Sequence, residues 1–400
     1  MAERTNVVIV GGGVAALEGA LALRALAPEA IDVEVVAPDE DFTYRPMLVA
    51  EPFGHGSVRT FPLRRLAEAA GARFRQAIVT DVDAENRVAR TASSDTIPYD
   101  ELLLATGAVP VTAVPGALCF RGPNEADGLE RVMDRAATGE IDRIVFAVPA
   151  GAAWALPLYE LALLARAWLV DEGSSGVDVI VVTAEDAPLA LFGSAASDAV
   201  SQLLAARGIG LVTSATPLAF SDGVLTTAPN GVVEADVAVA LPRLEGPRIA
   251  GVPHDSQGFI PTDDYGQVAG EVDVWAAGDA TTFPLKQGGI AAQQADAAAE
   301  SIAARAGLPV DPQPFRPVLR GLLLTGMVPR FLRAEPGTPA SMVDTEPLWW
   351  PPAKIVGRYL APFLAKHLGL SETVPEASRR NAVTVEVELA PWRPSEWSEV

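Results

Sequence analysis

The chain of 400 residues is poor in the residue types on which several kinds of protein chemistry depend. Its one cysteine, Cys119, excludes an internal disulfide or a paired-thiol redox centre, and we expect Cys119 to be a buried structural residue. Its three histidines, His55, His254 and His367, are scattered without the spacing of metal ligands, so no metal site is predicted. No apolar run of about eighteen residues occurs, so no membrane-spanning segment is predicted.

Positive charge is also scarce. The 30 Lys and Arg residues face 51 Asp and Glu residues, and the resulting net charge of −21 argues against nucleic acid as a partner. A hydrophobic content of 49% indicates a globular chain, and its length is enough for two domains and a tail. Because an apolar strand begins almost at the first residue, we expect no signal peptide and a cytoplasmic location.

A glycine-rich turn between a strand and a helix is the most informative feature present. Residues 7–10 are apolar, Gly11 and Gly13 follow at G-x-G spacing, and Ala16 takes the third small position. Such a turn lets backbone N–H groups approach a pyrophosphate, and the helix N-terminus adds partial positive charge. The pattern predicts a bound dinucleotide, with its pyrophosphate held by Gly11, Gly13, Val14, Ala15 and Ala16.

Two later strand ends indicate which dinucleotide this is. Residues 102–104 lead into Ala105-Thr106-Gly107, and residues 272–277 lead into Gly278-Asp279, followed by an alanine-rich helix expected over 289–304. This order resembles the flavoproteins with two dinucleotide-binding domains, and the resemblance implies FAD as the cofactor. In that family the Gly-Asp pair meets the ribityl and phosphate part of FAD, and the next helix starts under the flavin.

The resemblance implies further FAD contacts. The strand at 33–37 ends in Ala37-Pro38-Asp39, so either Asp39 binds the adenosine ribose or the backbone alone does. Arg45 faces either FAD or solvent, and Val79, in a strand expected over 74–82, meets the adenine through its backbone. Beyond the first turn, the expected FAD residues are Pro38, Asp39, Arg45, Pro46, Val79, Ala105, Thr106, Gly107, Gly278, Asp279, Lys286, Gln287 and Gly288.

A second strand–helix–strand unit begins at residues 143–148 but lacks the glycines of a nucleotide site. Only Gly151 remains of three, and Trp154 stands where the helix should begin, where an indole would obstruct a pyrophosphate. We predict an α/β fold of two Rossmann-like domains of the glutathione reductase type. The expected parts are an FAD domain of residues 1–113 and 246–325, a second domain of residues 114–245, and a C-terminal extension of residues 326–400.

The second unit also indicates a branch of the family. It resembles sulfide:quinone reductase and the flavin subunit of flavocytochrome c sulfide dehydrogenase at Pro149, Gly151, Ala152, Pro157, Tyr159, Glu160, residues 183–185 and residues 283–288. Those enzymes pass electrons from sulfur to flavin through paired cysteines, one of which belongs where Trp154 stands, so the sulfide route is not expected. Type II NADH dehydrogenases share the architecture but usually keep a fuller second glycine motif.

The sequence therefore predicts an FAD-dependent oxidoreductase that passes electrons from an unidentified donor to a quinone or protein acceptor. Lys286 would stabilise negative charge at the flavin, or is a surface lysine. Glu160 would relay protons, or is a hydrogen-bonded acid at the domain interface. The alternatives are an NAD(P)H:acceptor reductase like the type II NADH dehydrogenases, and a flavin-binding subunit of an electron-transfer complex.

The C-terminal region has an unusual charge pattern. Residues 312–333 and 348–370 contain no acid, are rich in apolar residues, and carry Arg316, Arg320, Arg330, Arg333, Lys354, Arg358 and Lys366. This region either rests peripherally on the inner face of a membrane or folds back with its cations facing acids of the FAD domain. A second copy of the chain, in a homodimer, is a further expected partner.

Overall fold

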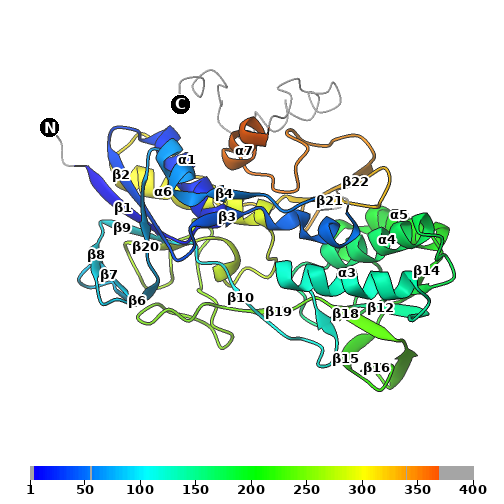
Figure 1. Ribbon diagram of the computed structural model, residues 1–400. Helices are drawn as coiled ribbons and strands as arrows, with labels where there is room; N and C mark the ends of the chain where they lie inside the picture. Colours follow the sequence, from blue (N-terminus) through cyan, green and yellow to red (C-terminus); the bar gives the residue numbers. More distant parts are fainter. Residues whose placement is uncertain (1–3, 55, 339, 369–400) are drawn as a thin grey trace.

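The computed structural model describes residues 4–54, 56–338 and 340–368, which form two α/β domains and an extension (Figure 1). The first domain is built on a parallel sheet with the strand order β20-β9-β1-β2-β5. These strands are β1 (Thr5–Val10), β2 (Ile31–Ala37), β5 (Arg73–Gln76), β9 (Glu101–Leu104) and β20 (Val274–Ala276). Their apolar runs are typical of parallel strands that are covered on both faces.

Alternate residues of these strands enter two different cores. One face, which includes Ile9 and Val35, packs on the small residues of helices α1 (Val14–Leu26) and α6 (Gly288–Arg305). The opposite face, which includes Val8 and Val36, packs on a three-stranded antiparallel sheet. The strands of that sheet are β6 (Val79–Asp83), β7 (Val88–Thr91) and β8 (Thr96–Pro98).

The prediction of a single strand over residues 74–82 is wrong, because two strands that belong to different sheets occupy this segment. β5 ends at Gln76 at the edge of the parallel sheet, and β6 begins at Val79 in the antiparallel sheet. A strand-like sequence pattern does not say in which sheet each half of the segment pairs. Between β2 and β5 lie β3 (Asp41–Thr43), η1 (Arg45–Phe53), β4 (Thr60–Pro62) and α2 (Leu63–Ala69).

The second domain repeats the architecture on a parallel sheet of order β11-β18-β12-β13-β14. Its strands are β11 (Leu118–Cys119), β12 (Arg143–Val148), β13 (Asp178–Thr183), β14 (Ile209–Val212) and β18 (Val237–Ala240). Helices α3 (Pro123–Ala137), α4 (Leu156–Asp171) and α5 (Ser194–Ala206) bury their apolar residues against one face. The other face is covered by β15 (Thr216–Ser221), β16 (Val224–Ala228) and β17 (Gly231–Glu234). Two Rossmann-like domains confirm the predicted fold class.

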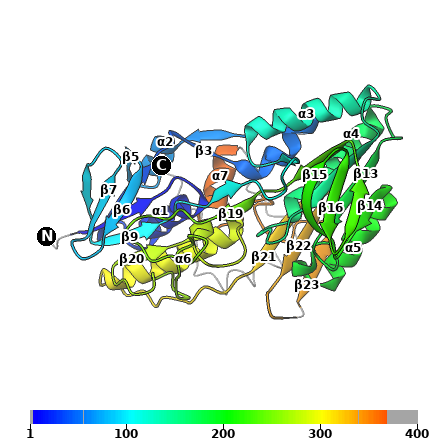
Figure 2. The same ribbon diagram turned by 90° about the horizontal axis from the view of Figure 1, so that it is seen from below.

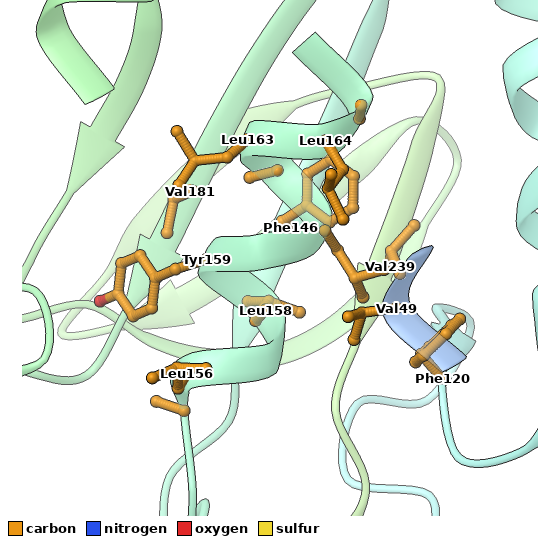
Figure 3. Packing of buried hydrophobic residues seen from close by; sticks show 14 of the residues in the cluster. Val49, Phe120, Phe146, Leu156, Leu158, Tyr159, Leu163, Leu164, Val181 and Val239 are labelled. Atoms are coloured by element: carbon orange, nitrogen blue, oxygen red, sulfur yellow. The ribbon is translucent and has the colours of Figure 1, made fainter. Parts of the chain in front are cut away.

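The two domains are tied together in two places. The antiparallel pair of β10 (Val109–Val111) and β19 (Arg243–Glu245) carries the chain out of the first domain and back. In addition, η1 of the first domain contributes Leu48, Val49 and Phe53 to the core of the second. Figure 3 shows Val49 beside Val239 and Leu158 of that core.

The C-terminal extension begins earlier than predicted. Its antiparallel sheet consists of β21 (Leu319–Leu323), β22 (Arg330–Ala334) and β23 (Ser341–Asp344), so the expected boundary at residue 326 falls inside a hairpin. Helix α7 (Leu360–Leu368) follows and lies above α1 and α6, near the junction of the domains (Figures 1 and 2). The predicted extension beyond residue 368 lies outside the described residues. Among described residues, no helix is both long and apolar enough to cross a bilayer.

Candidate FAD site and domain interface

The two glycines of the first turn, Gly11 and Gly13, have different roles. Gly11 is buried with φ of +132°, and a Cβ there would lie 2.1 Å from the carbonyl oxygen of Ala105, so β1 and β9 meet only because Gly11 has no side chain. Gly13 is exposed, and a Cβ there would meet nothing within 4 Å. Gly13 is the N-cap of α1, and no side chain caps that helix. The backbone N–H groups of its first turn are therefore available to a phosphate, as an FAD site requires.

The predicted motifs converge although they lie far apart in sequence. Gly278, in η3 (Gly278–Ala280), packs so closely on the first turn of α1 that a Cβ there would lie 3.1 Å from Ala15 Cβ. A Cβ on Gly288, at the start of α6, would lie 3.7 Å from the Val14 side chain. The N-termini of α1 and α6 therefore lie side by side, and both direct partial positive charge at the expected FAD site, which we refer to as the FAD cleft.

Asp279, Lys286 and Arg45 form one electrostatic group at this cleft. Burial raises the pKa of Asp279, while the charges of Lys286 and Arg45 lower it. Burial lowers the pKa of Lys286 to about 8, although Asp279 and Asp255 oppose this shift. The Lys286 ammonium donates to the Thr281 carbonyl oxygen and lies 4.1 Å from the centre of the Phe259 ring. Lys286 is only 7% exposed, so it is not a surface lysine.

A buried glutamine stabilises the turn that contains Asp279 through hydrogen bonds. Gln294, on α6, accepts a hydrogen bond from the Gly278 N–H at 2.8 Å, and its amide donates to the Thr281 hydroxyl at 3.3 Å. Gln287 caps α6 by accepting from the Ile290 N–H at 2.7 Å. Both side chains are buried, so the position of Asp279 is fixed by the helix behind it.

The remaining predicted FAD positions border the same cleft to different degrees. Thr106 and Gly107 follow β9 directly beside Gly11, and Pro38 and Asp39 are exposed where β2 ends. Val79 is buried at the start of β6. The assignment of Asp39 to the ribose and of Val79 to the adenine stays a prediction.

Glu160 lies at the domain interface in a buried ion pair. The ammonium of Lys354 donates to both carboxylate oxygens of Glu160, at 2.7 and 2.6 Å, and to the Pro46 carbonyl oxygen at 3.0 Å. The Leu324 N–H also donates to Glu160, at 2.8 Å. Burial raises the pKa of Glu160 and lowers the pKa of Lys354, and each charge opposes the shift of its partner. The pair therefore joins α4, η1 and the extension.

The acid at the expected second nucleotide position is hydrogen-bonded to side chains of its own domain. In a dinucleotide-binding unit an acid after the second strand binds the ribose hydroxyls. Glu185 stands just after β13, and its carboxylate accepts from the hydroxyls of Tyr159 at 2.6 Å and Thr183 at 3.0 Å. Burial raises the pKa of Tyr159, which keeps its hydroxyl protonated as the donor.

The extension packs on the second domain at the start of α4. A Cβ on Gly321, in β21, would lie 2.7 Å from side-chain atoms of both Leu156 and Phe192. Phe192 in turn makes an edge-on contact with Trp154, with ring centres 5.6 Å apart. Trp154 therefore belongs to the packing between the second domain and the extension, and α4 begins only at Leu156.

Three of the seven basic residues of the C-terminal region face inward, whereas Arg316 and Lys366 are exposed. Lys354 and Arg358 are each 8% exposed and pair with Glu160 and Glu300, and Arg333 is 11% exposed beside Glu335. Trp349 and Tyr359 are buried as well. Glu160 belongs to the second domain and Glu300 to the first, so this part of the extension is folded back onto both domains.

No cysteine or metal chemistry is visible among the described residues. Cys119 is 9% exposed in β11, and burial raises the pKa of its thiol. No group of three or more potential metal ligands is placed to hold an ion in that part of the chain. The His254 Nδ1 donates to the Val252 carbonyl oxygen at 3.1 Å, and His55 lies outside the described residues.

Two features of the site were missed in the sequence. The charge pattern of the sequence places Lys354 among the basic residues of the C-terminal region, but its ammonium is buried beside Glu160. Glu18 was overlooked within an apolar helix, although it is fully buried and binds the start of α7. A charged residue among apolar neighbours at a buried helical position was the one available signal, because such a residue requires a partner.

The fold and the cleft define a flavoprotein with two dinucleotide-binding domains. Residues 5–300, well over half of the chain, match the model of the pyridine nucleotide-disulphide oxidoreductase family. The chain belongs to this family and is an FAD-dependent oxidoreductase.

Solved structures show the same fold at low identity. The sulfide:quinone oxidoreductase of Aquifex aeolicus is 20% identical with a TM-score of 0.79, and the match covers 97% of this chain and 96% of that one. A ferredoxin reductase of Rhodopseudomonas palustris is 19% identical with a TM-score of 0.64, covering 84% and 83%. The water-forming NADH oxidase of Lactobacillus brevis is 18% identical with a TM-score of 0.59, covering 82% and 75%. The first of these supports the predicted likeness to the sulfide:quinone reductase branch.

Proposed function

We propose that this chain passes electrons from a donor other than NAD(P)H through FAD to a quinone or protein acceptor, without a cysteine relay. The observation that carries this proposal lies at the second nucleotide position, where Glu185 is bonded to Tyr159 and Thr183 and strand β21 packs on Leu156 and Phe192. The cytoplasmic location and the homodimer stay predictions.

The alternative, an NAD(P)H:acceptor reductase, requires a nucleotide in the second domain. Only Gly151 of the glycine motif is present, and the ribose acid already has two internal hydrogen-bond partners. Binding a ribose there would break these bonds and leave the buried Tyr159 hydroxyl without a partner, which is costly. The geometry therefore disfavours the alternative, although an NADH oxidase shares the fold.

The sulfide route of the similar reductase requires a second thiol. Cys119 is the only cysteine, and the residue at the position of a paired cysteine is Trp154. One thiol cannot form an internal disulfide and return two electrons. We therefore expect a donor that reduces the flavin directly.

The chain's own residues prepare the cleft for this chemistry. FAD supplies the two-electron redox centre when it is bound. The first turn of α1 would bind its phosphates, and Asp279 would meet its ribityl and phosphate part. Lys286, with its lowered pKa, places a positive charge where reduction adds negative charge, and the N-terminus of α6 adds to that charge. Glu160, bonded to Lys354, fixes the interface between the domains rather than moving a proton.

The proposal is tested on the holoprotein without oxygen. The protein is reduced with one equivalent of dithionite and mixed with a water-soluble quinone, and the flavin absorbance band is followed. We expect reoxidation by the quinone in the absence of oxygen. A flavin that stays reduced with the quinone but is reoxidised by oxygen alone would contradict a quinone acceptor.

A second candidate acceptor, an acidic redox protein, is favoured by one basic surface. Residues 59–75 carry five exposed arginines, Arg59, Arg64, Arg65, Arg73 and Arg75, against one glutamate, in a chain with a net charge of −21. Two of the guanidinium groups lie over aromatic rings, that of Arg59 at 5.7 Å from Phe61 and that of Arg64 at 5.3 Å from Phe74. None of the exposed large apolar side chains falls within this segment, so it resembles a protein docking surface more than a membrane one.

Reversing the charge of two arginines on this surface tests whether the acceptor is an acidic protein. The double variant Arg64→Glu/Arg65→Glu should slow reoxidation by a small acidic ferredoxin at low salt, and added salt should slow the wild type in the same way. Arg135→Glu, an exposed arginine on α3 paired with Glu140, is the matched control. Equal rates for all three proteins would remove this candidate.

A further inference from the structure

A segment of the extension, residues 353–360, crosses the helix N-termini of the FAD cleft; we refer to it as the strap. Ile355 is 2% exposed, and its side chain would lie 3.2 Å from a Cβ on Gly288. The Ile355 N–H donates to the Tyr44 hydroxyl at 3.2 Å, and the Lys354 ammonium donates to the Pro46 carbonyl oxygen at 3.0 Å. The strap therefore touches η1 and the first turn of α6, and Ile355 belongs to the core that includes α1.

A cluster of acids on α1 and α6 holds the far end of the strap. Glu18, which is 0% exposed, accepts from the N–H groups of Tyr359 at 2.8 Å and Leu360 at 2.7 Å. These N–H groups stand at the start of α7, where a negative charge is favourable. Arg358 pairs with Glu300 at 3.0 Å. The acids thus bind both the backbone and the side chain of the strap.

The fit between the strap and α1 depends on a glycine. A Cβ on Gly357 would lie 2.4 Å from Glu18 Oε2, which is closer than van der Waals contact allows. Asp296, on α6, shares a hydrogen bond with Glu18. Among described residues its Oδ1 is buried without a hydrogen-bond partner. The close approach of Gly357 to Glu18 marks a specific contact between the strap and α1.

We propose that Glu18 and Asp296 are positioning residues that latch the strap across the FAD cleft, so that retention of FAD depends on this remote pair of carboxyl groups. The proposal rests on the FAD site and is independent of the electron donor and acceptor. The strap would have to lift from η1 and α6 before the cofactor could leave.

Glu18 and Asp296 are two carboxyl groups that share one buried place. Burial raises the pKa of both groups, and their interaction raises the pKa of Asp296 further and lowers that of Glu18, so of the two it is Asp296 whose pKa is raised more. Burial raises the pKa of Asp296 well above its usual range, and the charges of Glu18 and Glu300 raise it further, whereas Arg358 lowers it. Tyr359 is the remaining ionisable group that faces the cluster. As the pH rises, Asp296 loses its proton and two negative charges face each other, which weakens the latch.

The test measures the release of FAD from purified holoprotein into an excess of an FAD-binding apoprotein, followed by flavin fluorescence. Glu18→Ala and Gly357→Ala should each release FAD about tenfold faster or more, the factor that one hydrogen bond to a charged group is worth. Glu34→Gln, a buried acid paired with Arg75, and Gly176→Ala, where a Cβ meets nothing, are the controls and should release FAD at the wild-type rate.

A pH series separates the latch from a general loss of stability. Wild-type release should accelerate as the pH rises, because Asp296 ionises. Asp296→Asn keeps a neutral donor toward Glu18, so its release should be slow and nearly independent of pH. Equal release rates in wild type, Glu18→Ala and Gly357→Ala would overturn the latch. A protein that binds no FAD at all would instead contradict the FAD site itself.

Discussion

At the scale of single residues, the two glycines of the first turn have different roles. Gly11 is required for the contact between β1 and β9, whereas Gly13 leaves space beside the start of α1. A substitution at Gly11 should therefore act on stability, and one at Gly13 on cofactor binding. Substitutions at these two glycines therefore distinguish an effect on folding from an effect on the cofactor site.

Gly13→Trp should leave the chain folded but colourless, because the indole would fill the space in which α1 offers its N–H groups. Gly11→Ala should lower the free energy of unfolding by about 3 kcal/mol, because the residue has a positive φ and a clash with Ala105. Flavin absorbance per chain and thermal unfolding of the apoprotein check both. A yellow Gly13→Trp protein with one FAD would contradict the placement of the pyrophosphate.

Lys286 should control the redox potential of the bound flavin. Because burial lowers its pKa to about 8, the side chain is charged below that pH and loses its charge above it. Lys286→Met should lower the midpoint potential at pH 7 by about 30 mV or more, equivalent to about 1.4 kcal/mol for two electrons. The difference from the wild type should shrink above pH 8. Spectroelectrochemistry measures this, and Lys286→Arg is the control that keeps the charge.

At the scale of elements, the buried pair of Glu160 and Lys354 joins α4, η1 and the strap. Lys354→Met should destabilise the chain by about 3–5 kcal/mol, because it leaves the Glu160 charge buried without its partner. The double variant Glu160→Leu/Lys354→Met should recover most of this loss. Chemical denaturation of the four proteins forms a double-mutant cycle. A Glu160→Gln protein that is stable but has lost flavin turnover at all pH values would instead favour the proton relay.

The elements that the sequence predicted well are those whose signals are local. The turn at Gly11 and Gly13 and the Gly278-Asp279 pair each combine an apolar strand with a motif of a few residues, and the structure brings them together. The role of Lys354 was not predictable, because its partner Glu160 lies 194 residues away. The same holds for Trp154, whose contact with Phe192 matters only once β21 packs beside it.

At the scale of the whole molecule, three cations of the extension are directed inward, and Arg316 and Lys366 are exposed. Lys354, Arg358 and Arg333 meet acids, and Ile355 and Leu360 enter the core of the FAD domain. We therefore expect no binding to anionic vesicles at low salt in a flotation assay. Deleting residues 345–400 should expose this apolar surface and weaken FAD retention. Salt-sensitive binding to anionic vesicles that this deletion abolishes would restore the membrane interpretation.

The central claim is that the FAD of this chain accepts no electrons from a nicotinamide bound in the second domain. The most direct measurement is an anaerobic titration of the yellow holoprotein with NADH and then NADPH, followed at the flavin absorbance band, with dithionite as the reference for full reduction. We predict that the oxidised spectrum persists up to about 1 mM nucleotide, the upper end of ordinary KM values, while dithionite bleaches it completely. Rapid, stoichiometric bleaching by micromolar NADH would contradict the account.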